Sequence, residues 1–131
     1  MGRFVNPDNS AFQVALNSPI YVDKTGLLEY TNSVLNTTEA YICNCRPRRF
    51  GKSYAANMLA AYYSKGCNSE EMFSSLEIGQ APGFTKYLNQ YDVIRINMQE
   101  FLSAAPDMDE MLKLLQKRIL RELKMQYPDY I

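Results

Sequence analysis

The spacing of apolar residues along the chain predicts short strands alternating with helices. Residues 41–45 form a short apolar run bounded by turn-forming residues, which is typical of a strand buried in a parallel sheet. Residues 54–63 are rich in alanine and contain neither glycine nor proline, so they predict a helix. Residues 92–97 form a second apolar run, and a right-handed crossover would join the two strands into a βαβ unit. Residues 20–22 predict a third, shorter strand.

Helical spacing recurs on both sides of this unit. Residues 25–35 predict a helix, and the longest predicted helix runs from residue 107 to 127, with a buried stripe of Met111, Leu112, Leu115, Ile119 and Leu123. Shorter helical segments are expected at 11–16, 68–73 and 84–88, and a loop at 79–83. The sequence shows no internal repeat and no low-complexity linker.

A basic, glycine-containing segment connects the first strand to the helix that follows it. Such a segment binds phosphate well: Gly51 allows close approach of the backbone, Lys52 places an ammonium between phosphates, and Ser53 offers a hydroxyl to magnesium. The helix start adds unpaired amides and a positive dipole end. The sequence therefore predicts a site for ATP and magnesium built from Arg46, Pro47, Arg48, Arg49, Phe50, Gly51, Lys52, Ser53 and Tyr54.

This segment departs from the G-x-x-x-x-G-K-[ST] template at its first position, where Arg46 replaces glycine. A side chain at this position must point away from the phosphates, and Pro47 removes one amide donor from the loop. Arg48 and Arg49 add two cations beside the site. The alternative is a basic turn that binds nothing.

Two blocks of sequence resemble a known family. Residues 21–25 (Tyr-Val-Asp-Lys-Thr) and then 46–53 (Arg-Pro-Arg-Arg-Phe-Gly-Lys-Ser) look like the bacterial AAA-ATPase-like family, whose members often carry a PD-(D/E)XK nuclease-like domain further along. The family commonly has R-P-R-R-F-G-K-S, and a weaker resemblance continues through residues 72–73 and 76–78 to 91–94. The resemblance implies a P-loop NTPase: an α/β fold with a three-layer parallel sheet and helices on both faces.

Within that fold the chain would be the N-terminal portion of one ATPase domain. Residues 1–38 would form a lead-in segment and helix, 39–66 the strand, P-loop and helix, and 67–131 the second strand and long helix. Residues 21–25 either line the nucleotide base or cap the helix that follows. We find no Walker B carboxylate at the end of the second strand, and Glu100 is expected to be solvated. We therefore expect nucleotide binding without autonomous hydrolysis.

Composition excludes several classes of protein. The chain has 14 basic and 14 acidic residues, so no net field attracts nucleic acid or an anionic membrane. It has no histidine, which removes His-ligated metals and Ser-His or Cys-His pairs. Its three cysteines are expected to be buried, reduced thiols. The N-terminus lacks a signal-peptide pattern and no apolar run is long enough to span a membrane, so we expect a cytoplasmic protein.

Two further functional classes remain open. In the first, Arg46, Arg48, Arg49 and Lys52 bind a nucleic-acid backbone, as in a nucleic-acid-binding or defence-related adaptor. In the second, the chain is a ligand-free, truncated remnant. The cations of the long helix are read as a solvated face, with contact to nucleic acid as the alternative. An incomplete sheet would leave Val93, Ile94 and Ile96 partly uncovered, so the partners expected besides nucleotide are a second copy, a downstream domain of a longer parent, or nucleic acid bound through that parent.

Overall fold

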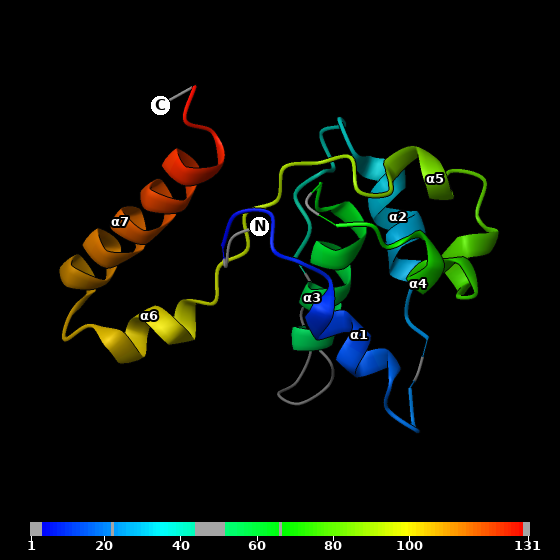
Figure 1. Ribbon diagram of the computed structural model, residues 1–131, viewed down its shortest axis with the longest axis horizontal. Helices are drawn as coiled ribbons and strands as arrows, with labels where there is room; N and C mark the ends of the chain where they lie inside the picture. Colours follow the sequence, from blue (N-terminus) through cyan, green and yellow to red (C-terminus); the bar gives the residue numbers. More distant parts are fainter. Residues whose placement is uncertain (1–3, 22, 44–51, 66, 130–131) are drawn as a thin grey trace.

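The computed structural model describes residues 4–21, 23–43, 52–65 and 67–129, and these residues fold mainly into helices. Figure 1 shows the helices in two groups. Helices α1 to α5 form the larger group, and α6 and α7 form a hairpin beside it. The elements are α1 (Ser10–Leu16), α2 (Gly26–Val34), α3 (Lys52–Tyr63), α4 (Glu70–Ser74), the 3-10 helix η1 (Glu77–Gln80), α5 (Phe84–Tyr87), α6 (Met98–Ala104) and α7 (Met108–Gln126).

The predicted three-layer parallel sheet is wrong. The described residues form no sheet, and their β-type pairing consists of two isolated bridges, Val5 with Ile94 (antiparallel) and Ser64 with Tyr91 (parallel). Residues 41–43, the described part of the first predicted strand, have no regular structure. The side chain of Tyr41 is 96% exposed, so this apolar run is not buried by neighbouring strands as a parallel sheet requires. Residues 44–45 lie outside the described part.

The other predicted strands form no ladder either. Residue 20 is 87% exposed, and residue 22 lies outside the described part. Residues 92–97 run between the two helix groups and touch other backbone at single positions only: the Arg95 amide donates to the Phe4 carbonyl, and the Asn6 amide donates to the Val93 carbonyl. Ile94 and Ile96 remain 54% and 39% exposed, as expected for a segment with incomplete cover.

Most helices were predicted correctly, whereas α6 was missed. Helices α2, α3, α4, α5 and α7 lie close to where they were predicted, and α1 is a fuller helix than the single turn expected. Part of the predicted loop at 79–83 belongs to η1. Helix α6 begins after Asn97, whose Oδ1 accepts the Gln99 amide at 3.1 Å. Asn97 followed three residues later by Glu100 is a helix-start pattern, so the sequence did contain a signal for α6.

The larger group is held together by an aromatic core. The rings of Phe12 and Phe73 stack at 4.9 Å, and Tyr62 meets Phe73 edge-on at 5.4 Å. All three side chains are almost completely buried. Because aromatic pairs contribute beyond the area that they bury, this cluster fixes α1, α3 and α4 relative to one another.

The hairpin has a smaller core of its own. Phe4 and Phe101 lie 5.4 Å apart, and Met111 is 2% exposed beside them. Leu112, which was predicted to be in the buried stripe of α7, is 45% exposed. The Glu122 carboxylate accepts the amides of Phe4 and Val5 at 2.7 and 2.9 Å, so the N-terminal segment is fastened to α7.

Asn89 caps the C-terminal end of α3 from outside the helix. Its Nδ2 donates to the carbonyls of Ser64 and Ala61 at 2.8 and 3.0 Å, and its Oδ1 accepts the Ser69 amide at 2.9 Å. The last carbonyls of a helix have no partner within the helix, so this amide satisfies groups that would otherwise be left unbonded. Asn89 adopts φ 54°, a left-handed conformation that asparagine tolerates better than most residues.

The structure describes two of the three cysteines. Cys43 is exposed and Cys67 is half-buried, so the prediction of buried thiols is wrong for Cys43; Cys45 lies outside the described part. Among the helices that the structure describes, none combines the length and apolar character needed to cross a membrane.

Replacing Asn89 with Ala should destabilise the fold by about 3 kcal/mol, because it removes the cap and also strains a left-handed backbone. Asn36→Ala is the matched control, since Asn36 has φ 61° but is exposed after α2. The control should cost about 1 kcal/mol from the backbone alone. Urea denaturation of both variants measures the difference, and equal losses would mean that the side-chain bonds of Asn89 contribute nothing.

Candidate functional site

The predicted phosphate-binding loop meets the described structure at the first residue of α3. Helix α3 begins at Lys52, and Ser53 follows in its first turn. The first exposed side chain described in the helix is Tyr54, at 62% exposure. The remaining predicted site residues lie outside the described part of the chain: Arg46, Pro47, Arg48, Arg49, Phe50 and Gly51.

The start of α3 has the electrostatic character of an anion site. The helix has 12 residues, so its aligned peptide dipoles place a partial positive charge at the Lys52 end. The first amides of any helix have no partner within the helix, and they are the groups that bind phosphates at helix starts. No acidic residue occurs in the first turn of α3. The first turn of α3 therefore combines two sources of positive charge, the helix dipole and the Lys52 side chain, and contains no carboxylate.

The opposite end of α3 is fixed in the core. Tyr62 is completely buried, and its hydroxyl donates to the Phe84 carbonyl at 2.7 Å while accepting from Asn32 Nδ2 at 3.1 Å. The neighbouring Tyr63 hydroxyl donates to Asn32 Oδ1 at 2.6 Å. These bonds join α3 to α2 and α5, so the helix is held from its C-terminal half.

Burial keeps these tyrosine hydroxyls protonated. Removal from water raises the pKa of Tyr63 to about 12 and raises the pKa of Tyr62 in the same direction, despite bonds from Thr31 and Asn32 that favour the ionised form. Both groups therefore remain hydrogen-bond donors over the whole physiological range. Their role is to position the helix.

The block at residues 21–25 fastens η1 to the start of α2. Asp23 Oδ1 accepts the amide and the hydroxyl of Thr25 at 2.9 and 2.6 Å, while Asp23 Oδ2 accepts the Glu77 amide at 2.8 Å. Thr25 Oγ1 in turn accepts the Ile78 amide at 3.1 Å. Of the two roles considered for residues 21–25, these contacts favour the structural one. They also bring together two segments, 23–25 and 77–78, that lie more than fifty residues apart.

These bonds determine the ionisation of Asp23. Partial burial opposes the charged form, but the bonds from Thr25 and from the Glu77 amide outweigh it, so the pKa of Asp23 lies below its ordinary value of 3.8. The charged carboxylate is thus the form that the folded chain stabilises.

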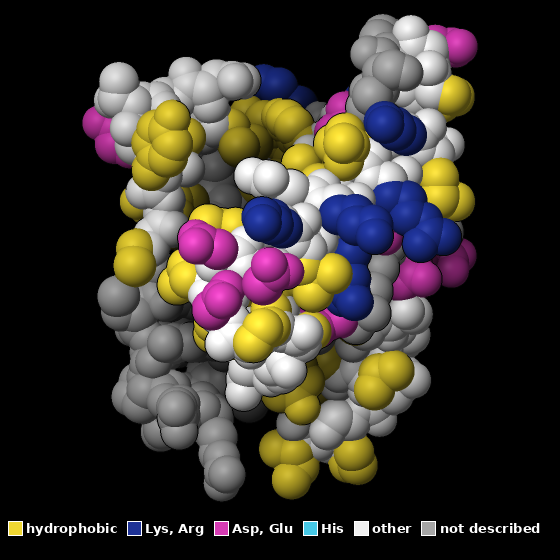
Figure 2. All heavy atoms as spheres, turned by 90° about the vertical axis from the view of Figure 1, so that its left-hand side faces the viewer, with side chains coloured by type: hydrophobic (Ala, Val, Ile, Leu, Met, Phe, Trp, Pro, Cys, Tyr) yellow, Lys and Arg dark blue, Asp and Glu magenta, His cyan; other side chains and the backbone are white. Residues whose placement is uncertain are grey.

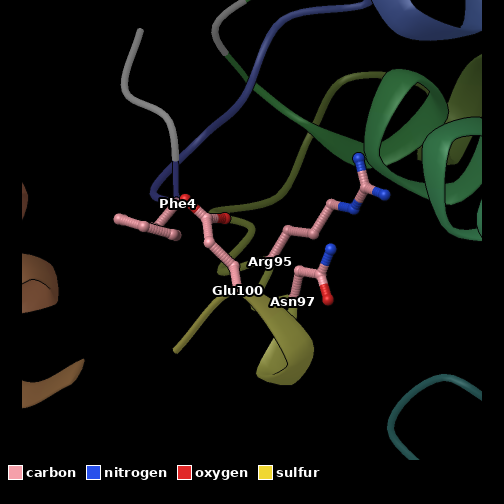
Figure 3. Close-up of a pocket in the computed structure, with 4 residues that line it drawn as sticks. All are labelled: Phe4, Arg95, Asn97 and Glu100. Atoms are coloured by element: carbon pink, nitrogen blue, oxygen red, sulfur yellow. The ribbon is translucent and has the colours of Figure 1, made fainter. Parts of the chain in front are cut away.

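Glu100 lines a small polar pocket on α6. The pocket has a volume of about 170 Å³ and is also lined by Phe4, Arg95 and Asn97 (Figure 3). In Figure 3 the Arg95 side chain extends away from Glu100. Asn97 is occupied in capping α6, as described above. Within the described residues, no three His, Cys, Asp or Glu side chains gather closely enough to hold a metal ion, so Glu100 is not part of a carboxylate cluster there.

Sequence reasoning missed a polar network that links α3 to α7. Asp92 accepts a short hydrogen bond from the Tyr127 hydroxyl, and its other oxygen lies 3.2 Å from Lys65 Nζ. Asn6 Nδ2 donates to the Tyr127 oxygen at 2.7 Å, and Asn6 Oδ1 accepts the Val93 amide. The hydrogen bond from Tyr127 lowers the pKa of Asp92 and raises that of Tyr127. No local pattern in the sequence indicates the distant partners of Asn6.

The chain matches a protein-family model. A family model described as Predicted AAA-ATPase, AAA-ATPase-like, matches residues 11–130, nearly the whole chain. The matched range includes the predicted phosphate-binding loop, the Asp23–Thr25 contact and all of α3. No curated protein and no solved structure matches the chain.

The Asp23 contact predicts a pH-dependent contribution to stability. Because its pKa is lowered in the folded state, the carboxylate stabilises the fold above the unfolded pKa of about 4, and this contribution is lost as the pH falls through the folded pKa. Asp23→Asn should therefore destabilise the chain at pH 6, and the gap to the wild type should close toward pH 3. Denaturation curves at several pH values measure it, with Asp129→Asn, in the exposed turn after α7, as control. A gap that does not depend on pH would contradict the assignment.

Proposed function

The chain belongs to the AAA-ATPase-like family of predicted AAA-ATPases, and on that basis we propose that it binds ATP with magnesium through residues 46–53 and the start of α3. Family membership supports nucleotide binding at a coarse level. The observation that carries the finer proposal is that α3 begins at Lys52, directly after Gly51. The Gly-Lys-Ser tripeptide therefore spans a helix start, which is where a phosphate-binding sequence needs it.

The roles of the individual residues follow from their chemistry. Gly51 allows the backbone to approach the phosphates, and Lys52 supplies the ammonium that neutralises them. The Ser53 hydroxyl is a hard oxygen ligand of the kind that magnesium accepts while keeping most of its waters. Arg46, Arg48 and Arg49 add positive charge, and Pro47, Phe50 and Tyr54 complete the proposed site. When bound, magnesium would neutralise charge on the phosphate oxygens.

The anchoring of α3 supports this assignment. The helix is held at its C-terminal half by Tyr62, Tyr63 and Asn89, so these contacts do not involve its first turn. A ligand site built on a fixed helix loses less conformational entropy on binding than one built on a mobile segment. No carboxylate in the first turn repels a nucleotide phosphate.

Replacing Lys52 with Ala should weaken ATP binding by roughly 1.5 to 3 kcal/mol, which is about tenfold or more in affinity, because a charge-assisted contact to phosphate is lost. Isothermal titration with magnesium ATP measures the effect. Lys86→Ala, an exposed lysine in α5, is the control and should bind as the wild type does. Equal affinity of the wild type and Lys52→Ala would exclude this loop as the site.

The same titration separates nucleotide binding from backbone binding. Binding of ATP should depend on magnesium and only weakly on added salt, whereas binding of a nucleic-acid backbone weakens steeply with salt as counterions are released. A steep salt dependence without a magnesium dependence would favour the second class of function.

We further propose that the chain alone hydrolyses ATP at no more than background rate. Phosphoryl transfer to water needs an acidic or polar group that organises the metal and the water. The candidate carboxylate, Glu100, belongs to α6, which packs against α7, whereas α3 packs against α1. Phosphate release from the purified chain tests this. A rate above background that disappears in Glu100→Gln would assign Glu100 to catalysis and overturn the proposal.

A further inference from the structure

Helix α7 presents a line of positive charge on its outer side. Lys113, Lys117, Arg121 and Lys124, here called the α7 stripe, are all exposed. At 100° per residue they lie within about 80° of one another around the helix, and at a rise of 1.5 Å per residue they extend over about 16 Å. Figure 2, which views the hairpin side of the molecule, shows Lys and Arg side chains gathered beside a smaller acidic group.

Of the acidic residues of α7, Glu110 lies at the N-terminal end of this stripe and Glu122 lies on another side of the helix. Glu122 is the acid that interleaves with the cations in sequence, but it lies nine residues after Lys113 and thus on the opposite side of the helix. There its carboxylate accepts the amides of Phe4 and Val5. Glu110 lies in the first turn and pairs with Lys113 at 3.9 Å. The part of the stripe from residue 117 to 124 therefore faces outward without an intervening carboxylate.

Two arginines line a hollow beside the stripe. It has a volume of about 280 Å³ and is lined by Phe4, Arg118, Arg121, Glu122 and Met125. The Arg118 guanidinium is placed over the Phe101 ring, 5.7 Å from its centroid, and the Glu122 carboxylate accepts the amides of Phe4 and Val5. Guanidinium groups bind phosphate oxygens through two parallel hydrogen bonds, so Arg121, which belongs to the stripe, offers directional contacts next to the lysine point charges.

From this geometry we propose that the outer face of α7 binds the phosphate backbone of a nucleic acid. A linear series of cations one helical turn apart complements a linear polyanion, and phosphate contacts from Lys and Arg supply binding that is independent of base sequence. The chain is neutral overall, so this attraction is local to α7. The site is separate from the proposed ATP site and does not depend on it.

Two other occupants fit the face less well. A membrane-binding helix inserts one exposed apolar face. The exposed apolar residues of α7 are Met108, Leu112, Leu120 and Met125, and at 100° per residue they lie at different angles around the helix, so they form no single face. A second copy could place its acidic first turn, with Asp109 and Glu110, against the stripe in an antiparallel pair. That arrangement would leave the two arginines of the hollow without a specific role.

The test compares two lysine pairs that change the net charge equally. The double variant Lys117→Gln/Lys124→Gln removes two contacts of the stripe, and Lys24→Gln/Lys86→Gln removes two exposed lysines elsewhere. Binding of a labelled 20-base-pair DNA duplex is measured by fluorescence anisotropy at several salt concentrations. We expect the slope of log affinity against log salt to fall in magnitude by about 1.8 for the first pair, at about 0.9 per phosphate contact, and to be unchanged for the control.

Each alternative has its own signature. Absence of duplex binding by the wild type, or equal losses in both double variants, would overturn the proposal. So would a loss of duplex binding in Lys52→Ala with retention in Lys117→Gln/Lys124→Gln, since that would assign the backbone contact to residues 46–53. Binding to anionic lipid vesicles without duplex binding would favour a membrane surface. A sedimenting dimer that dissociates in Lys117→Gln/Lys124→Gln, without duplex binding, would favour a second copy.

Discussion

The structure depends on the way in which the C-terminal end of α3 is held. Asn89 satisfies the carbonyls at the helix end, and Tyr62, completely buried beneath them, bonds to both α2 and α5. A helix end in a protein interior needs such partners, because each unbonded buried carbonyl costs free energy. The proposed phosphate site lies at the other end of this helix, more than fifteen ångströms away at about 1.5 Å per residue.

The two core clusters organise different parts of the fold. The aromatic core around Phe12, Tyr62 and Phe73 organises helices α1 to α5. The smaller core around Phe4, Phe101 and Met111 organises the hairpin that carries the α7 stripe. The Asp92, Tyr127 and Lys65 contacts connect the two. Nucleotide and backbone binding are therefore proposed for separate surfaces that one polar network joins.

Helices could be predicted from the sequence because their evidence is local. The 3.6-residue spacing of apolar positions located α2 and α7, and the alanine-rich composition of residues 54–63 located α3. The strands could not be predicted reliably, because an apolar run such as 41–43 or 92–97 becomes a strand only when a neighbouring strand pairs with it. Asn89, Asn6 and Glu122 were missed for the same reason: each acts through partners 20 or more residues away, and one-dimensional spacing contains no information on them.

The hydrogen bonds from the Phe4 and Val5 amides to Glu122 also affect the order in which the parts of the chain fold. These hydrogen bonds close loops of 118 and 117 residues, almost the full length of the chain. Closing so long a loop costs more chain entropy than closing a short one, and this cost comes before the contact is made. The contacts within residues 10–91 join residues that are closer in sequence, so their loops cost less entropy. The larger group of helices can therefore form first, and the hairpin core is completed when the two ends of the chain meet. Because α6 and α7 are neighbours in sequence and contact each other directly, the step that this long loop delays is the docking of the N-terminal segment against α7.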